Sequence, residues 1–151
     1  MSGQLSARLI VFTALIVCGL AAPRVGFAQT RGFLTVDLPV PNTFREKIVT
    51  VGLGGLHDLL DNWISVGGQA DFHGIYSARI GPFAQANVVN HTRYRLFVLG
   101  GYAFGENGGT RIGAGVELMP AARRVGLRAI VQRYSNENTP VTSVEVGLTW
   151  R

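Results

Sequence analysis

The sequence contains a single cysteine, a single lysine and few charged residues of any kind. Charged residues make up only 15% of the 151 residues, and Lys47 is the one lysine. The surface of a soluble domain usually carries about 25–35% charged residues of both signs. The composition therefore argues against an ordinary water-exposed surface. The one cysteine, Cys18, lies near the N-terminus, and a chain without that segment could form no internal disulfide.

The sequence also lacks an apolar run long enough for a membrane-spanning helix, which needs about 20 residues. Its longest apolar stretch, Leu9–Leu20, has twelve. Arg8 precedes this stretch, and the small residues of Gly26–Ala28 follow it, as in a secretory signal peptide. We therefore predict that residues 1–28 are a cleaved signal peptide and that residues 29–151 form one mature domain. A retained N-terminal anchor is the alternative.

The sequence shows no cluster of basic residues and no cluster of metal ligands. Cleavage would remove Arg8 and Arg24 and leave 12 basic against 9 acidic residues, a net charge of +3. The basic residues stand singly, without the interleaved aromatic residues of a nucleic-acid surface. His57, His73 and His91 lie far apart and lack the spacing of a metal site. We therefore expect no nucleic-acid partner, no metal and no cofactor.

After residue 28 the sequence has almost no helical periodicity, and two-residue alternation takes its place. Aliphatic residues recur at every second position, and the residues between them are polar or glycine. Successive side chains of a β-strand point to opposite faces, so each run predicts a strand with one aliphatic and one polar face. Eight runs follow the pattern: 33–40, 47–56, 63–73, 79–89, 93–104, 111–118, 125–132 and 143–151.

Eight strands of about 9–11 residues each, the length that spans a bilayer, fill the mature chain and leave short connections. The segment His57–Asn62 is expected to be a turn. Pro82 has no backbone N–H, so the fourth strand is expected to bulge there or to begin late. An even number of strands brings both termini to one side, the periplasmic side in membrane barrels. The predicted fold is all-β: an eight-stranded antiparallel up-and-down transmembrane β-barrel.

A soluble eight-stranded barrel, such as a lipocalin-like carrier, also alternates but turns its aliphatic face inward. Three features favour the opposite arrangement. Glycines are frequent among the Arg, Gln and Glu of the polar face, which suits a crowded interior, and the chain has few charges for a solvated surface. Aromatic residues lie near the predicted strand ends, as expected at two membrane interfaces. They are Tyr94 and Trp150 at one end and Phe72, Tyr102 and Phe104 at the other.

Charged residues on the polar face would then point into a narrow lumen, where opposite charges must pair. Arg128 is predicted to pair with Glu145, which lies diagonally across on the next strand, and Glu117 is the alternative partner. A barrel of eight strands is just wide enough for its own side chains, so we expect a closed lumen. A gated channel or a proton path is the functional alternative.

Three segments resemble the small outer-membrane β-barrels, a group that includes the transmembrane domain of outer-membrane protein A. They are Arg111–Glu117 (RIGAGVE), Val125–Ala129 (VGLRA) and Glu145–Trp150 (EVGLTW). The resemblance implies a monomer in the bacterial outer membrane, surrounded by membrane lipid and lipopolysaccharide. The terminal strand is similar to the signal that the barrel-assembly machinery reads, although Arg151 follows the aromatic Trp150.

The segment Tyr134-Ser135-Asn136 resembles the motif of the lipid A 3-O-deacylases, which are also eight-stranded outer-membrane barrels. The resemblance places Ser135 at the position of their nucleophile. Their histidine base stands two residues earlier, where this chain has Arg133, and an arginine cannot accept a proton. We therefore expect no catalytic residue and a non-enzymatic structural or surface-interaction role. The alternatives are a lipid A-modifying hydrolase, which would be degenerate without its base, and a soluble carrier.

Overall fold

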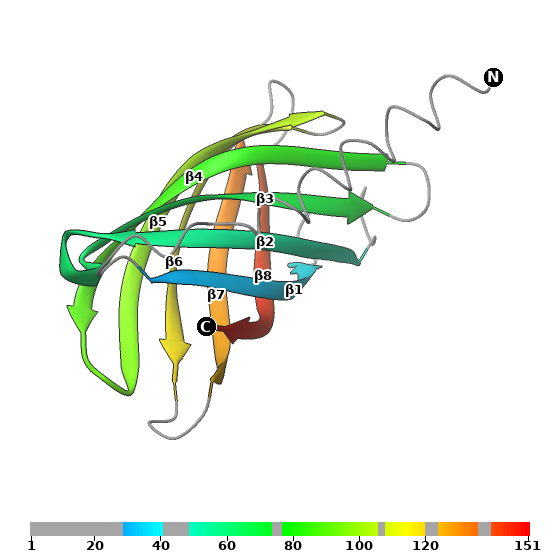
Figure 1. Ribbon diagram of the computed structural model, residues 1–151. Coiled ribbons are helices and arrows are strands. Elements are labelled where there is room, and N and C mark those ends of the chain that lie inside the picture. The colour runs from blue at the N-terminus through cyan, green and yellow to red at the C-terminus, as the bar shows by residue number, and fades with distance from the viewer. Residues whose placement is uncertain (1–28, 41–48, 74–76, 106–107, 120–123, 136–139) are drawn as a thin grey trace, which may run out of the picture.

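The computed structural model describes residues 29–40, 49–73, 77–105, 108–119, 124–135 and 140–151. These residues form a closed barrel in which each strand pairs antiparallel with its sequence neighbours and β1 pairs with β8 (Figure 1). The strands are β1 Thr30–Pro39, β2 Thr50–Leu59, β3 Ile64–His73, β4 Ser77–Asn90, β5 Tyr94–Gly105, β6 Gly109–Leu118, β7 Val125–Ser135 and β8 Pro140–Trp150. The predicted all-β, eight-stranded up-and-down barrel is confirmed. The predicted signal peptide lies outside the described residues.

The two ends of the barrel differ in what they carry. At one end, called the termini end, β1, β3, β5 and β7 begin and β2, β4, β6 and β8 end. At the other end, called the loop end, β2, β4, β6 and β8 begin and β1, β3, β5 and β7 end. Within the part of the chain that is described, no helix has the length and apolar character needed to cross a membrane.

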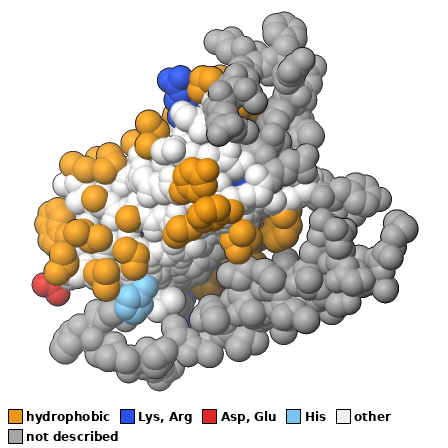
Figure 2. Space-filling model, turned by 90° about the horizontal axis from the view of Figure 1, so that it is seen from above, with side chains coloured by type: hydrophobic (Ala, Val, Ile, Leu, Met, Phe, Trp, Pro, Cys, Tyr) orange, Lys and Arg blue, Asp and Glu red, His pale blue; other side chains and the backbone are white. Residues whose placement is uncertain are grey.

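The aliphatic face of each strand points outward. On β8, Val146 and Leu148 are 43% and 46% exposed, whereas Glu145 and Thr149 on the alternate positions are 0% and 1% exposed. Figure 2 shows the consequence on one side of the molecule, where hydrophobic side chains are spread over the wall and charged ones are few. A water-soluble monomer rarely exposes so much apolar surface. An apolar exterior around a charged interior is the arrangement of a transmembrane barrel, as predicted.

Exposed aromatic side chains form a belt at each end of this apolar wall. Trp63, Tyr94 and Trp150 lie at the termini end, with 51%, 41% and 38% of their surface exposed. Tyr102 and Phe104 lie at the loop end, and their rings meet edge to face with centroids 4.9 Å apart. Such aromatic girdles mark the two interfaces of a membrane barrel.

Glycines on the inner face make room for large inward side chains. A Cβ atom added at Gly54 would collide with the ring of Phe33, and one at Gly115 would come within 2.7 Å of the ring of Phe97. Phe33 and Phe97 are 0% and 2% exposed, so both rings fill the lumen. The interior of the barrel is therefore packed by alternating small and large residues rather than left open.

The predicted turn at His57–Asn62 begins later than expected. β2 continues to Leu59, and only Leu60–Asn62 form the turn, all three with positive φ angles of 47°, 54° and 68°. The strand continues because its alternation continues: Asp58 is 2% exposed and points into the lumen. The turn is held from β4, where the side-chain amide of Asn87 donates to the backbone carbonyl of Asn62.

The expectation for Pro82 was wrong. β4 begins at Ser77 and passes through Pro82, which lies opposite Gly68 of β3. On the other side, the register with β5 is the same before and after Pro82, and the irregularity falls instead between Asn87 and Val89. A proline without an N–H is tolerated here because the pairing with β5 skips Gly81 and Pro82, so the missing donor falls at a gap in that ladder.

Candidate functional site

Among the described residues, ten charged side chains are buried in the lumen, five basic and five acidic. They are Arg31, Arg79, Arg95, Arg111 and Arg128 together with Asp37, Asp58, Asp71, Glu117 and Glu145. Each is at most 6% exposed. An isolated buried charge is very unfavourable, so buried charges need partners of opposite sign. The formal charges of these ten side chains cancel. Because they are the described charged groups inside the barrel, we take the network of contacts among them as the candidate functional site.

Arg31 of β1 is the centre of the network toward the termini end. Its Nη2 lies 2.5 Å from Asp58 Oδ1 on β2, and its Nη1 lies 2.5 Å from both carboxylate oxygens of Glu117 on β6. The hydroxyl of Ser65 donates to Asp58 Oδ1 at 2.7 Å, and Arg95 Nη1 lies 3.4 Å from Asp58 Oδ2. One guanidinium therefore ties together three strands on opposite sides of the lumen.

Arg128 does not form the predicted ion pair with Glu145. It lies 3.5 Å from Glu117 Oε2, the alternative partner, and donates to Gln85 Oε1 at 3.0 Å. The reason is the register: Glu117 stands directly opposite Arg128 on β6, whereas Glu145 stands opposite Ile130 on β8. The diagonal between Arg128 and Glu145 that the sequence predicted exists, but the side chain turns the other way.

The guanidinium of Arg128 is also held between two aromatic rings. Its centre lies 5.0 Å from the ring centroid of Phe33 and 4.6 Å from that of Phe97. Cations are attracted to the faces of aromatic rings, and more strongly where water is excluded. This contact helps to explain how a fully buried arginine is tolerated beside a carboxylate that it shares with Arg31.

Glu145 is instead the partner of Arg111, in the middle of the barrel. Arg111 Nη2 lies 2.9 Å from Glu145 Oε2, while its Nη1 and Nε donate to the side-chain oxygens of Gln69 and Gln132 at 2.6 and 2.5 Å. Gln69 and Gln132 in turn donate to Glu145 Oε2 at 3.0 and 3.1 Å. The two amides complete a ring of hydrogen bonds around the ion pair.

A second group of charges lies nearer the loop end. Arg79 Nε donates to Asp71 Oδ2 at 2.8 Å, and Arg79 Nη2 lies 3.4 Å from Asp37 Oδ2. The guanidinium is centred 3.7 Å from the ring centroid of Tyr134, whose hydroxyl donates to Asp71 Oδ2 at 3.4 Å. Gln132 Nε2 reaches Asp37 Oδ2 at 3.2 Å, so this group is joined to the Arg111–Glu145 pair.

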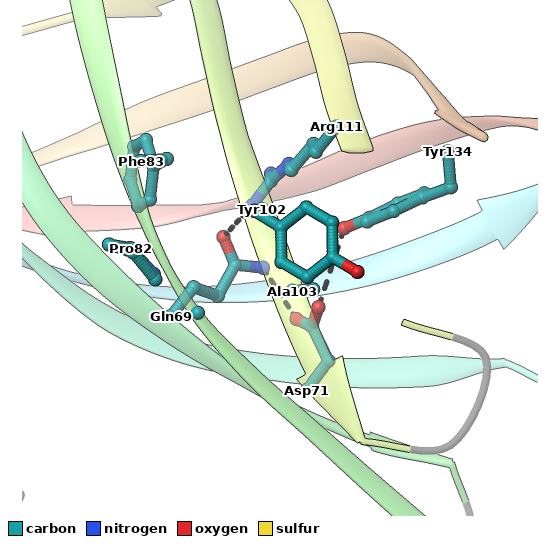
Figure 3. Close-up of a pocket in the computed structure, with 9 residues that line it drawn as sticks. Gln69, Asp71, Pro82, Phe83, Tyr102, Ala103, Arg111 and Tyr134 are labelled. Carbon is teal, nitrogen blue, oxygen red and sulfur yellow. Dashed lines mark hydrogen bonds between the residues drawn. The ribbon is translucent and has the colours of Figure 1, made fainter. Parts of the chain in front are cut away.

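A small cavity remains between these two groups (Figure 3). The space open to the centre of a water-sized sphere is about 10 Å³, which is close to the minimum for a single water molecule. The figure shows Arg111, Gln69, Asp71 and Tyr134 linked by hydrogen bonds around it. Its lining residues are Gln69, Asp71, Gly81, Pro82, Phe83, Tyr102, Ala103, Arg111 and Tyr134. A cavity of this size can hold water but not an organic substrate.

Sequence reasoning missed Arg31 and Asp58 because it began the first strand and ended the second three residues too far inward. The predicted first strand began at Phe33 and the second ended at Leu56. The signal was present, since Arg31 shares the inward position of Phe33, and Asp58 that of Leu56. Extending the alternation by one step at each end would have found both residues.

Ser135, the residue of the alternative enzyme hypothesis, lies at the last position of β7 and is exposed on the outside. Tyr134 before it points into the lumen, and Arg133 is exposed like Ser135. None of the histidines in the described segments lies on β7 or on its neighbours β6 and β8. His73 is on β3, where its Nδ1 lies 2.7 Å from the hydroxyl of Thr50, and His57 is on β2. The strand neighbourhood of Ser135 therefore offers it no histidine base.

Metal ligands are likewise not gathered into a site. Across the described ranges, no group of three or more His, Cys, Asp or Glu side chains is placed to hold a metal ion. The five lumen carboxylates are instead shared among arginines and amides.

Solved structures similar to this chain are membrane barrels with little sequence identity to it. A de novo designed transmembrane barrel, TMB2.3, shares 15% identity at a TM-score of 0.63, covering 85% of this chain and 98% of the design. The outer-membrane protein Ail of Yersinia pestis shares 12% identity at a TM-score of 0.57, covering 83% and 99%. The N-terminal β-barrel domain of Pseudomonas aeruginosa OprF shares 10% identity at a TM-score of 0.55, covering 82% and 96%.

At this level of identity the likeness shows the fold, which is that of small outer-membrane barrels. No protein-family model matches the chain. Comparison with curated protein sequences also finds no match.

Proposed function

We propose that this chain is a non-enzymatic protein of the bacterial outer membrane, with a closed polar lumen and a structural or surface-interaction role. The observation that carries the proposal is the neutralised lumen. Ten buried charges pair across the interior, and large side chains such as Phe33 and Phe97 fill the space between them. Such an interior serves to hold the wall together, whereas a pore needs a continuous watery path. The outer-membrane location is supported by the apolar wall and by the likeness to Ail and OprF.

The proposed partners are the lipids of that membrane. The two aromatic belts would sit at its interfaces, and the barrel-assembly machinery would insert the chain. We further propose that the protein acts as a monomer, because the described barrel pairs β1 with β8 and leaves no strand edge open for a second copy.

Membrane fractionation and electrophoresis test the location and the barrel. We expect the mature chain to fractionate with the outer membrane and to migrate as a compact band that shifts on boiling. Reconstitution into planar bilayers tests the closed lumen, with a large general porin as the positive control. We expect no steady conductance steps from the wild type, and stable steps would reject the closed lumen.

A lipid A assay tests the absence of enzymatic activity. The purified barrel is incubated with lipid A, and mass spectrometry follows the loss of a hydroxyacyl chain. We expect no loss, because Ser135 has no base in its strand neighbourhood. Loss of the chain with the wild type but not with Ser135→Ala would establish the hydrolase instead.

A further inference from the structure

Near the loop end of β6, β7 and β8, a group of polar residues takes the place of aliphatic residues on the outer wall of the barrel. Four exposed polar side chains lie there, and we call them the exterior polar patch: Thr110, Arg133, Ser135 and Thr142. Thr110 pairs with Ser135, and Arg133 pairs with Thr142, so the four side chains occupy two neighbouring rows of the sheet. The rest of the wall at this end carries residues such as Leu38, Ile80 and Phe104.

Arg133 is the only charged residue exposed within the described strands. The ten buried charges all point into the lumen, and the other exposed charges of the described chain, Asp61, Arg93, Arg124 and Arg151, lie in connections or at the terminus. Among the described residues, no side chain forms a hydrogen bond or an ion pair with the Arg133 guanidinium. The guanidinium is therefore free to bind an anionic group, and on this face the surrounding lipid can supply one.

The depth of the patch fits a lipid headgroup. Tyr102, in the aromatic belt of the loop end, pairs with Thr110, which pairs with Ser135, so these residues lie in one row of the sheet near that end. Arg133 is two residues closer to the middle of the barrel, about 7 Å along the strand. A long arginine side chain bends toward the interface when its backbone lies in the apolar layer. Its guanidinium then reaches the level of the Thr110 and Ser135 hydroxyls.

These groups match the chemistry of a phosphate. The planar guanidinium donates two parallel hydrogen bonds to phosphate oxygens, and hydroxyl groups can donate others. The loop end faces outward if the termini are periplasmic, as in membrane barrels with an even number of strands. The phosphate available at that level is the one carried by the lipid A part of lipopolysaccharide.

We propose that the exterior polar patch binds a lipid A phosphate of the outer leaflet, with Arg133 as the main ligand and Thr110, Ser135 and Thr142 as its hydroxyl neighbours. The proposal rests on the outer-membrane location proposed above. It gives Ser135 a role in binding on the lipid-facing wall, at the strand end where the sequence resembles a hydrolase motif.

The test uses the mature chain in phosphatidylcholine nanodiscs that contain a small fraction of lipid A with its phosphates. Retained lipid A is counted by mass spectrometry of the purified particles. Arg133→Gln should retain about tenfold less lipid A than the wild type, because a charge-assisted hydrogen bond is lost. Arg93→Gln, which removes an exposed arginine at the opposite end, is the matched control and should change nothing.

Two further arms identify the ligand. For lipid A without phosphates, the wild type and Arg133→Gln should retain the same small amount. The wild type should retain less phosphatidylglycerol than lipid A. Equal retention by wild type and Arg133→Gln, or equal retention of dephosphorylated lipid A, would overturn the site. Equal retention of phosphatidylglycerol would overturn the choice of lipid A.

The folded state is checked separately, by compact migration on unheated gels from nanodiscs that lack lipid A. If Arg133→Gln does not fold, the double variant Thr110→Val/Ser135→Ala replaces it. This variant should retain about threefold less lipid A than the wild type, because two neutral hydrogen bonds are lost. Unchanged retention would overturn the site. A wild type that does not embed in phosphatidylcholine would refute the membrane-barrel function itself. A wild type that embeds but retains lipid A with and without phosphates equally would refute only the phosphate-binding role of the exterior polar patch.

Discussion

Arg31 has no exposed surface and contacts acidic side chains from two other strands, Asp58 of β2 and Glu117 of β6. Arg31→Ala would leave Asp58 with the Ser65 hydroxyl and the longer ionic contact to Arg95, and Glu117 with only the longer contact to Arg128. Removing one partner of a buried ion pair typically costs about 3–5 kcal/mol. We expect a loss of that size in the free energy of unfolding, measured by urea titration in lipid vesicles with tryptophan fluorescence as the signal. Arg93→Ala, an exposed arginine, should stay within about 0.5 kcal/mol of the wild type.

The partner of Arg128 can be settled at the same scale by two double-mutant cycles. One combines Arg128→Ala with Glu117→Gln, and the other combines Arg128→Ala with Glu145→Gln. Side chains in contact show interaction energies of about 0.5–3 kcal/mol. We expect a coupling in that range with Glu117, at 3.5 Å, and a smaller one with Glu145, which contacts Arg111 instead. A larger coupling with Glu145 would restore the pair that the sequence predicted.

At the scale of the strand, the depth of a residue in the membrane should decide the cost of a charge. Val146 lies near the middle of β8 and is 43% exposed, whereas Leu38 lies near the loop end of β1 and is 44% exposed. Arginine on the lipid face costs about 2–4 kcal/mol at the bilayer midplane and about 0–1 kcal/mol near the interface. Val146→Arg should therefore lower the free energy of unfolding in vesicles by about 2–4 kcal/mol, and Leu38→Arg by no more than about 1 kcal/mol. Equal losses at the two depths would show that this face does not meet lipid.

Most of the strands could be predicted from the sequence because lipid outside and charge inside impose a strict alternation. In β8, for example, Val144, Val146 and Leu148 alternate with polar residues such as Glu145 and Thr149. Only one assignment of the two faces to lipid and lumen fits this pattern. The strand ends were harder, because a turn residue and an inward polar residue look alike: Asp58 was assigned to a turn and belongs to β2. The effect of Pro82 was also missed, because it depends on how β5 pairs with β4, and that pairing skips Gly81 and Pro82.

The site was predictable only in part. Alternation alone places Arg128, Glu117 and Glu145 in the lumen, and the structure has all three there. It does not say which way a long side chain turns once inside. Arg128 contacts Glu117 and Gln85, whereas Arg111 and two glutamines share one carboxylate oxygen of Glu145. The partners in such a network depend on all strands at once.

At the scale of the whole molecule, the barrel exists only because β1 and β8, at opposite ends of the sequence, pair with each other. Eight residue pairs join them, from Gly32 with Trp150 to Pro39 with Ser143, and the indole of Trp150 covers Gly32 at the seam. Closure removes the two exposed strand edges that an open sheet of the same strands would present to lipid. The lumen contacts of Arg31 on β1 and of Glu145 on β8 are positioned by this seam.

Cysteines placed across the seam should therefore form a disulfide. Val36 and Val146 stand opposite each other on β1 and β8, and the mature chain predicted from the sequence has no cysteine of its own. Directly paired positions of an antiparallel ladder have Cα atoms about 4.5–5.5 Å apart, within the range of a disulfide. We expect Val36→Cys/Val146→Cys to cross-link on mild oxidation in vesicles, so that the boiled, unreduced protein migrates differently from the reduced one. Val36→Cys/Val131→Cys pairs β1 with β7, two strands apart, and should not cross-link. Cross-linking of the control pair but not of the seam pair would show that the barrel does not close between β1 and β8.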